Sequence, residues 1–411
     1  MPPQATRNFF SPGRQPGVQM PKDVPSPFRG DTKLMAKAFA TPPDTPAALG
    51  YRMPAEWEPH EATWIAWPHN RSDWPGKFEA VPWIYAEIVR HLARVEGVNI
   101  LVDDEAAEMK ARQVLVSSHV LPEKAAQPGK AAGNIRFFRI PTDRVWMRDY
   151  GPIFVCRDSK KGSLPRVAAT AWRFNAWAKY NDWKLDAPAG AEIARLLKLP
   201  AWRPEMRVNG ELHRIVLEGG SIDVNGRGTL ITTEECLLSE VQQRNPGVSR
   251  RHLEELFADY LGIEKVIWLE RGIAGDDTHG HVDDITRFVG PRTVVTAYEP
   301  DPDDPNHDPL SDNFRWLKKS SDQAGKSLKV VKLPMPKPVY FEGQRLPASY
   351  ANFYIANKLV LVPIFGDTND RVALDTLADL FPEREVVGIY CRDFIWGLGA
   401  LHCMTQQQPA G

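Results

Sequence analysis

The end of the chain carries a histidine and a cysteine side by side, in a place that suits a catalytic thiol. Residues 396–408 read Trp-Gly-Leu-Gly-Ala-Leu-His-Cys-Met-Thr-Gln-Gln-Gln, so Cys403 follows two glycines and precedes a polar run. A structural cysteine usually lies inside an apolar strand, whereas Cys403 lies between apolar and polar sequence. Because a catalytic thiol needs partial exposure and a stabilised thiolate, Cys403 is a candidate nucleophile. The alternative is an incidental cysteine near a chain end.

A second segment, residues 275–284, is dense in ionisable groups: Gly-Asp-Asp-Thr-His-Gly-His-Val-Asp-Asp. If it is extended, His279, His281 and Asp283 point to one face, because side chains alternate along a strand. Two interpretations stay open. The three residues could hold a metal ion, since the segment is similar to the HxHxDH signature of metallo-β-lactamase-like hydrolases. Otherwise one histidine moves protons while Asp283 binds a cationic substrate.

Two further candidates are carboxylates that stand beside glycines. Asp149 precedes Gly-Pro within residues 144–152, where the sequence predicts a turn after a short strand. Glu218 stands at a predicted strand end before Gly219 and Gly220, and these glycines would let a ligand approach closely. Ordinary turn chemistry is the alternative for both.

Taken together, the candidates are one thiol, one or two histidines and the three carboxylates Asp149, Glu218 and Asp283. Carboxylates around a nucleophile repel an anionic substrate and favour a cation. A guanidinium fits best, because its planar fork of N–H donors matches paired carboxylates. The chemistry that these residues predict is thiol attack on a guanidinium carbon.

The composition is that of an ordinary globular protein. The chain has 411 residues, of which 43% are hydrophobic and 25% charged, and 51 basic residues against 52 acidic ones give a formal net charge of −1. No strong overall charge attracts it to nucleic acid or to an anionic membrane. It has no run of eighteen apolar residues, so a transmembrane helix is not expected.

Cysteine usage indicates the compartment. The four cysteines, at 156, 236, 391 and 403, form no CxxC pair, which argues against a zinc ribbon and suits a reducing compartment. No apolar segment typical of a signal peptide precedes the rest of the chain. We therefore expect a cytoplasmic protein.

The chain divides into a tail and one domain. Residues 1–50 hold ten prolines and are predicted to form an extended or disordered tail, whereas residues 51–411 form a single domain. Hydrophobic periodicity and turn signals predict an α/β domain with mixed sheets. The predicted helices are 84–95, 187–197, 253–261 and 373–381; the predicted strands are 98–102, 214–216, 221–224, 229–232, 265–269 and 385–390; hairpins are predicted at 285–297 and 353–363, and a surface loop at 299–312.

A series of motifs in a fixed order resembles the agmatine deiminase and bacterial-type peptidylarginine deiminase family of guanidine-modifying enzymes. The resemblance covers about residues 51–408. It rests on seven segments: Met-Pro-Ala-Glu-Trp-Glu-Pro-His at 53–60, Trp-Ile-Ala-Trp-Pro at 64–68, Trp-Met-Arg-Asp-Tyr-Gly-Pro at 146–152, Phe-Asn-Ala-Trp at 174–177, Leu-Glu-Gly-Gly at 217–220, Asp-Thr-His-Gly-His-Val-Asp at 277–283, and His-Cys-Met-Thr-Gln-Gln at 402–407. Any one of them alone has little specificity, but together they are highly specific.

The resemblance implies a fold and a reaction. The fold is the pentein α/β-propeller, with pseudo-fivefold ββαβ units around a central active-site channel. Cys403 is the implied nucleophile, which attacks the guanidinium carbon and expels ammonia to leave a covalent thiouronium that water hydrolyses. His281 is the implied acid and base.

The resemblance also implies the substrate contacts. Asp149 and Asp283 grip the guanidinium nitrogens, Glu218 helps to hold the substrate or His281, and Trp146 lines the pocket or packs. No metal or other cofactor is implied. The expected partner is a small cationic guanidine compound rather than nucleic acid or a membrane, and a homo-oligomer stays open.

Agmatine is the leading substrate, with N-carbamoylputrescine and ammonia as products on a route to putrescine. Peptidyl-arginine or another guanidine is the close alternative, with citrulline as the peptide product. Free arginine would need a cation for its α-carboxylate, which Arg148 or Lys179 could supply. From a different class, a metal-dependent hydrolase would use His279, His281 and Asp283.

Overall fold

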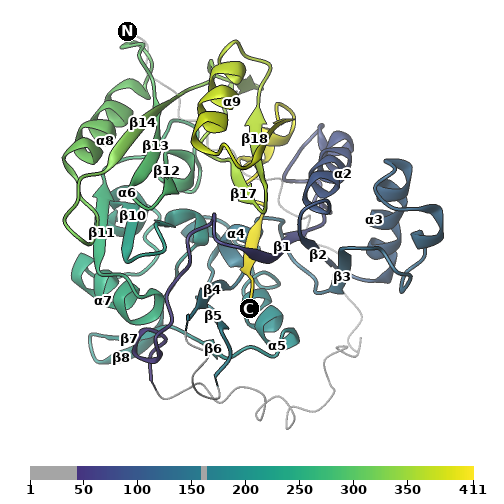
Figure 1. The fold of residues 1–411 in the computed structure, drawn as a ribbon, viewed down its shortest axis with the longest axis horizontal. Helices are drawn as coiled ribbons and strands as arrows, with labels where there is room; N and C mark the ends of the chain where they lie inside the picture. Colours follow the sequence, from purple (N-terminus) through teal and green to yellow (C-terminus); the bar gives the residue numbers. More distant parts are fainter. Residues whose placement is uncertain (1–43, 159–163) are drawn as a thin grey trace, which may run out of the picture. The chain divides into compact units, whose positions relative to one another are not determined.

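Small β-sheets, each followed by helices, make up the part of the chain that the structure describes (Figure 1). The structure is a computed structural model, and it describes residues 44–158 and 164–411. Residues 1–43 of the predicted proline-rich tail lie outside the described residues. Next to them, Ala47–Leu49 form a 3-10 turn, and Leu49 packs against the hydrophobic core. The division into a tail and one domain at residue 50 stays a prediction.

The first sheet joins the two ends of the described chain. Its strand order is β20 (Gln406–Pro409), β1 (His60–Ala66), β2 (Gly97–Val102) and β3 (Ile135–Arg139). Helices α2 (Val81–Leu92) and α3 (Glu105–Ser117) connect its parallel strands, whereas β20 pairs antiparallel with β1. Figure 1 shows the last strand, in yellow, beside β1. This pairing fixes the turn that carries His402 and Cys403, because that turn leads directly into β20.

Four other sheets share one order: an antiparallel pair, then at least one helix, then a strand parallel to the second. They are β4 (Ile153–Cys156), β5 (Val167–Thr170), α5 (Ala189–Leu196), β6 (Ala201–Trp202); β9 (Asp223–Val224), β10 (Thr229–Thr233), α6 (Glu234–Leu238), α7 (Arg250–Leu261), β11 (Lys265–Leu269); β12 (Thr286–Gly290), β13 (Thr293–Tyr298), α8 (His307–Lys319), β14 (Lys329–Pro334); and β17 (Tyr354–Ala356), β18 (Leu359–Ile364), α9 (Asn369–Leu380), β19 (Glu385–Tyr390). The pairs β7 (Glu205–Val208) with β8 (Glu211–Arg214) and β15 (Tyr340–Phe341) with β16 (Gln344–Arg345) are short hairpins. The predicted mixed α/β class is confirmed.

Amphipathic helices cover these sheets, and α7 shows how sequence produces one. Its buried residues Leu253, Leu256, Phe257 and Leu261 recur at helical spacing and form one apolar face. The Ser249 hydroxyl accepts a hydrogen bond from the backbone N–H of His252, which caps the first turn. The helix therefore begins three residues before the predicted segment 253–261, because apolar periodicity does not register a polar cap.

Strands 98–102, 265–269 and 385–390 are confirmed, as are both predicted hairpins, with ends shifted by a residue or two. The predicted strand 221–224 is confirmed only at Asp223–Val224 (β9), because Gly219–Ser221 form a 3-10 turn. The predicted strand 214–216 is wrong, because β8 ends at Arg214 and Val216 makes only an isolated bridge. The prediction of a surface loop at 299–312 is wrong in its second half. Helix α8 begins at His307, because Leu310 is buried in the core.

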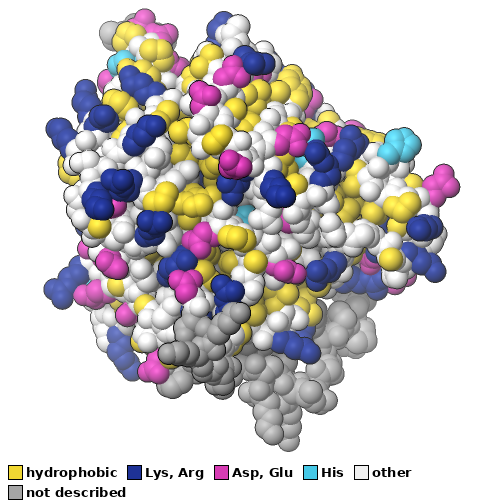
Figure 2. Space-filling view, viewed as in Figure 1, with side chains coloured by type: hydrophobic (Ala, Val, Ile, Leu, Met, Phe, Trp, Pro, Cys, Tyr) yellow, Lys and Arg dark blue, Asp and Glu magenta, His cyan; other side chains and the backbone are white. Residues whose placement is uncertain are grey.

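One face of the molecule carries charges of both signs. On the face drawn in Figure 2, Lys and Arg side chains are interspersed with Asp and Glu. None of the described helices is both long and apolar enough to cross a membrane.

The core of α7 gives a test of the packing. Phe257→Ala removes a fully buried ring and is expected to cost about 3–5 kcal/mol of unfolding free energy. Leu212→Ala is the control, because Leu212 is 59% exposed and its loss costs about 0.5 kcal/mol or less. Thermal unfolding followed by circular dichroism measures both. Equal melting temperatures for the two variants would contradict this account of the core.

Candidate active site

The turn that carries Cys403 is held by the side chain of Asn352. The amide oxygen of Asn352 accepts hydrogen bonds from the backbone N–H groups of His402 (2.9 Å) and Cys403 (3.3 Å). Its Nδ2 donates to Cys403 Sγ at 3.0 Å and to Asp284 at 2.9 Å. The sequence predicted a partly exposed thiol, and that is wrong, since Cys403 is only 5% exposed. The thiol is therefore fixed in position inside the protein.

Asp283 lies between the thiol and the imidazole of His281. Its Oδ2 accepts from His402 Nδ1 at 2.7 Å and lies 3.6 Å from Cys403 Sγ, while its Oδ1 lies 4.0 Å from His281 Nδ1. All four residues are buried. One carboxylate thus contacts the nucleophile candidate with one oxygen and faces the acid–base candidate with the other.

Asp149 completes a pair of carboxylates beside His281. It lies in the helical turn α4 (Met147–Tyr150) rather than in the predicted plain turn. Its Oδ2 accepts from Trp177 Nε1 at 2.9 Å, and its Oδ1 accepts from the backbone N–H of Gly220 at 3.1 Å. That Oδ1 also lies 3.9 Å from His281 Nδ1. The two hydrogen bonds fix both oxygens of Asp149, and Oδ1 lies beside the same nitrogen that Asp283 faces.

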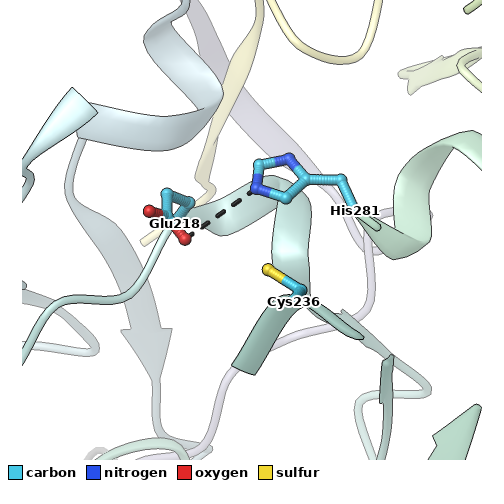
Figure 3. Close-up of side chains that lie close together, drawn as sticks. All are labelled: Glu218, Cys236 and His281. Carbon is cyan, nitrogen blue, oxygen red and sulfur yellow. Dashed lines mark ion pairs between the residues drawn. The ribbon is translucent and has the colours of Figure 1, made fainter. Parts of the chain in front are cut away.

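Glu218 faces the other ring nitrogen. Its Oε2 lies 3.8 Å from His281 Nε2 (Figure 3). Its Oε1 accepts from Arg244 Nε at 3.1 Å. Arg244 is itself anchored by hydrogen bonds to the backbone carbonyls of Gln242 and Thr278. The guanidinium of Arg244 therefore orients Glu218, and Glu218 faces the back of the imidazole.

The two glycines after Glu218 make room for protein groups. A Cβ on Gly220 would lie 2.6 Å from His281 Nδ1 and 2.9 Å from Asp149 Oδ1, and a Cβ on Gly219 would lie 2.4 Å from the Arg148 carbonyl oxygen. The sequence predicted that these glycines let a ligand approach; in the structure they instead let His281, Asp149 and the Arg148 backbone pack closely. Any side chain at position 220 would displace the imidazole or the carboxylates.

Burial and charge set the protonation of His281 and Glu218. Burial alone would lower the pKa of His281, but Asp149, Cys236 and Glu218 together raise it well above its usual value. Burial alone would raise the pKa of Glu218, but Arg244 and His281 lower it to about 2. The imidazole is therefore protonated and Glu218 ionised at neutral pH.

Burial and neighbouring charges also shift the pKa values of Asp149 and Cys403, and both shifts favour the neutral form of the group. Burial raises the pKa of Asp149 to about 7, with His281 opposing the shift. Burial and the neighbouring carboxylates Asp283 and Asp284 raise the pKa of Cys403 well above its usual value. Both groups would ionise more readily if a cation lay beside them.

Several buried polar atoms of this cluster have no partner among the described residues. Both ring nitrogens of His281, Oδ1 of Asp283 and Oε2 of Glu218 make no hydrogen bond there. Most buried polar groups in proteins are paired, so such a group of exceptions needs an explanation. A planar cation with several N–H donors would satisfy the carboxylate oxygens that face His281 Nδ1.

Behind His402, a buried ion network fixes the turn from the other side. Glu56 Oε2 lies 2.8 Å from His402 Nε2 and 3.3 Å from Arg148 Nη2, and Glu56 Oε1 lies 2.9 Å from Arg287 Nη2. Burial raises the pKa of Glu56, but Arg287 and His402 outweigh it and hold that pKa well below the usual value. Arg148 also donates to Gln407 at 2.6 Å, so its charge is fully engaged inside the protein.

Two predicted residues lie outside this cluster. The segment 275–284 is not extended: His279 has a positive φ of 66°, and residues Val282–Asp284 form a 3-10 turn. As a result the His279 ring lies beside Ser239 and Glu235, and the proposed metal set of His279, His281 and Asp283 does not assemble.

The ring of Trp146 packs against other aromatic side chains. Its ring lies 5.8 Å from that of Trp74 and 6.1 Å from that of Phe394, and a Cβ on Gly399 would lie 2.6 Å from it. These are packing contacts that support the loop before Cys403. Its predicted place in a substrate pocket stays a prediction.

Sequence reasoning assigned no role to four residues that contact the cluster: Glu56, Trp177, Arg244 and Asn352. Glu56 and Trp177 lie inside motifs that carry the family resemblance, which was a usable signal. Arg244 and Asn352 lie in no such motif. Only the fold brings them to the site.

The cluster contains two sets of atoms that could hold a metal ion. Within the described chain, ligand atoms of Glu218, Cys236 and His281 all lie within 4.8 Å of one another, as do those of Asp283, Asp284 and Cys403. The second set is hydrogen-bonded to His402 and Asn352, although Asp283 Oδ1 is unpaired, whereas in the first set Glu218 Oε2 and both ring nitrogens of His281 are unpaired.

A buried thiol and imidazole among paired carboxylates are typical of cysteine enzymes that act on a planar cation. The model of the Porphyromonas-type peptidyl-arginine deiminase family matches residues 52–409, and the chain belongs to this family. It is 38% identical over 395 residues to an agmatine deiminase of Pseudomonas aeruginosa (strain LESB58), with 90% of this chain and 99% of the relative covered. The predicted family is confirmed.

Solved structures agree. A structure of the agmatine deiminase of Enterococcus faecalis catalyzing its reaction is similar to this chain, with a TM-score of 0.75 at 32% identity, over 89% of this chain and 98% of that one. A cysteine-to-serine agmatine deiminase of C. jejuni with substrate bound has a TM-score of 0.74 at 28% identity, over 88% and 97%.

Gly220→Ala tests the close packing around His281. The added methyl group is expected to displace the imidazole and lower kcat/KM by about 100-fold, because small misplacements of catalytic groups have effects of this size. Gly290→Ala is the matched control, since the nearest atom to its Cβ is 3.8 Å away. Steady-state kinetics on both variants gives the answer. Full activity in Gly220→Ala would show that His281 tolerates displacement.

Proposed function

We propose that this protein is an agmatine deiminase, which hydrolyses agmatine to N-carbamoylputrescine and ammonia. The observation that carries the proposal is the set of unpaired, buried carboxylate and imidazole atoms beside the thiol of Cys403. A guanidinium, which carries only N–H donors, pairs in one plane with the carboxylate oxygens of this set. The names of the relatives, agmatine deiminases in Pseudomonas and Enterococcus, support the same substrate.

Asp149 and Asp283 hold the guanidinium in this proposal. Their oxygens lie 3.9 and 4.0 Å from His281 Nδ1, so a substrate that bridges them lies directly against the imidazole. Because Asp283 also contacts Cys403 Sγ, the guanidinium carbon is brought next to the sulfur. Positioning of this kind accounts for a large share of the rate.

The substrate itself activates the thiol. In the free protein, burial and the carboxylates around Cys403 keep its pKa high. A bound guanidinium cation neutralises those carboxylates and favours the thiolate. The Asn352 Nδ2–H group, 3.0 Å from the sulfur, then stabilises the anion by a hydrogen bond. Thiolate formation is thereby coupled to substrate binding.

His281 moves the protons in both half-reactions. Thiolate attack forms a C–S bond, and the imidazolium donates its proton to the departing nitrogen, so that ammonia leaves and a thiouronium remains. The neutral imidazole then takes a proton from water, which attacks the same carbon. The C–S bond breaks, the ureido product leaves and His281 regains its charge. Glu218 stabilises that charge from the opposite ring nitrogen.

The structure favours agmatine over free arginine. An α-carboxylate requires a cation, and the sequence offered Arg148 or Lys179. Arg148 is buried against Glu56 and Gln407, and Lys179 lies 3.6 Å from Asp277. Since both candidate cations are paired, a substrate without a carboxylate fits better.

We also infer that the five sheets form the pseudo-fivefold pentein propeller. In each of these sheets, a site residue lies no more than five residues before the first strand. Asp149 precedes β4, Glu218 precedes β9, Asp283 precedes β12, Asn352 precedes β17 and Cys403 precedes β20. Five sheets that each contribute the segment before their first strand support a ring of repeated units around the site.

Agmatine turnover tests the function directly. Purified protein is expected to release ammonia and N-carbamoylputrescine from agmatine, with kcat/KM at least about 100-fold above that for arginine, because an unpaired carboxylate is costly to bind. An arginyl peptide serves as the third substrate. Release from the peptide alone would place the protein among peptidylarginine deiminases and overturn agmatine.

Cys403→Ala tests the nucleophile. Loss of the thiol removes the covalent route, so agmatine turnover is expected to fall at least about 10⁴-fold while the fold is retained. Cys391→Ala is the control, since Cys391 is equally buried and makes no contact described in the site. Turnover that survives Cys403→Ala but is abolished by EDTA would replace the thiol mechanism with a metal-dependent one.

The pH profile tests Asp149. Its carboxylate must be ionised to hold the guanidinium, and its pKa of about 7 means that protons leave as pH rises. We therefore expect kcat/KM to increase with pH through about 7. Asp149→Asn should lower kcat/KM by at least about 100-fold, since a broken buried charge pair costs about 3 kcal/mol, and should remove this rise. A rise that persists in Asp149→Asn would assign it to another group.

A further inference from the structure

A second cysteine lies against the catalytic cluster, and the mechanism does not use it. Cys236 is the third residue of α6, and it is fully buried. The Thr233 hydroxyl accepts from the backbone N–H of Cys236 and donates to the carbonyl oxygen of Gly280, so the start of α6 is tied to the loop that carries His281. Figure 3 shows the sulfur directed toward Glu218 and the imidazole.

We propose that Glu218, Cys236 and His281 form a binding site for a thiophilic divalent cation of the zinc class, and that this cation inhibits the enzyme. Thiolate, imidazole and carboxylate are the ligands that Zn²⁺ prefers. Their ligand atoms lie within 4.8 Å of one another, and the Oε2–Nε2 distance is 3.8 Å. Bond lengths of about 2.0–2.3 Å in a tetrahedral site need separations of roughly 3.3–3.6 Å, so a contraction of about 1 Å suffices.

The unpaired atoms of the cluster support this site. His281 Nε2 and Glu218 Oε2 make no hydrogen bond within the described part of the chain, although both side chains are fully buried. Arg244 occupies only the other oxygen of Glu218, which leaves Oε2 free for a metal. Two ligand atoms are therefore unengaged and face one another across the position that the ion would take.

The charges around the site also favour a dication. Asp149 and Asp283 lie about 4 Å from the far side of the imidazole and add to the field of Glu218, while Arg244 is the cation that opposes it. Binding of Zn²⁺ releases the proton of the Cys236 thiol and one proton of His281 to solvent. The resulting thiolate, the Glu218 carboxylate and the two aspartates outweigh the charges of the ion and of Arg244.

The bound ion would stop catalysis by fixing His281. With Nε2 bound to metal, the imidazole is neutral and keeps only its Nδ1 proton, which is a far weaker acid than the imidazolium, so it cannot protonate the departing nitrogen efficiently. Substrate contacts lie on the Nδ1 side, so the substrate and the ion occupy opposite sides of the ring. Inhibition is therefore expected in kcat, and saturating agmatine should not relieve it. This inhibitory part rests on the proposed deiminase function, whereas the binding part does not.

The first experiment measures Zn²⁺ inhibition of the full chain after removal of adventitious metal. Loss of an outer-shell partner lowers metal affinity about 10–100-fold, so loss of a direct ligand in Cys236→Ala should raise the inhibitory Zn²⁺ concentration at least about 100-fold. Cys391→Ala, which removes another fully buried thiol, should match the wild type. Equal inhibition of Cys236→Ala and wild type, or inhibition relieved by agmatine, would overturn the proposal and indicate the set around Cys403 instead.

A second experiment needs no activity and remains valid if agmatine is not the substrate or if Cys236→Ala folds poorly. Co²⁺ replaces Zn²⁺ as a coloured probe, and Cys403→Ser removes the competing set. We expect Cys403→Ser to show thiolate-to-cobalt charge-transfer absorption, with one ion bound per chain, and Cys403→Ser/Cys236→Ser to lose it. Absence of that absorption in Cys403→Ser, with its presence in Cys236→Ser, would overturn the proposed site.

Discussion

Buried negative charge is the constraint on which the rest of this structure depends. Asp149, Glu218 and Asp283 surround one imidazole, and each is excluded from solvent. An isolated buried carboxylate is strongly destabilised, so each needs hydrogen-bond donors or cations inside the protein. The fold supplies them unequally. Arg244 serves Glu218, His402 serves Asp283, and Asp149 accepts hydrogen bonds, among the residues that the structure describes, only from the neutral donors Trp177 Nε1 and Gly220 N–H.

This unequal supply separates the roles of the three carboxylates. Glu218 has a guanidinium partner and a pKa of about 2, so it is ionised at any physiological pH and fixes the charge of His281. Asp149 has no such partner, and its pKa of about 7 leaves it in need of a cation. The protein thus leaves part of the carboxylate charge uncompensated, and a guanidinium substrate completes it. Affinity and thiol activation then have the same electrostatic origin.

The sequence predicted elements where apolar residues repeat and failed where backbone is shaped by long-range contacts. Strand 265–269 was correct to the residue, and all five of its residues pair with β10. Residues 214–216 were also predicted to form a strand, but the partner of Val216 is Arg173, 43 residues earlier, in a single bridge. An extended segment 275–284 would place His279 and His281 on one face, but the left-handed backbone at His279 sends that ring away from His281. The hydrophobic periodicity of a sequence does not reveal such a change in backbone direction.

The candidate site shows the same division. Cys403, His281, Asp149, Glu218 and Asp283 could be found because each is a reactive residue type in a distinctive local segment. Asn352 could not, since it is an ordinary amide placed 51 residues before the thiol that it contacts. Arg244 is likewise an arginine that looks solvated in sequence and is fully buried in the structure. Residues that react leave local signals, whereas residues that position them are defined by the topology.

That topology explains why one small cluster draws on the whole chain. The site residues lie in the short segments that precede the first strands of five different sheets, and hydrophobic clusters that span neighbouring sheets tie these sheets together. A shift of any sheet would change the 3–4 Å separations among the buried carboxylates and the imidazole. Close contacts such as Gly220 against His281 and Gly399 against Trp146 allow little such movement. Rigid packing between sheets is therefore the physical condition for keeping uncompensated charge in a fixed arrangement until a cation binds.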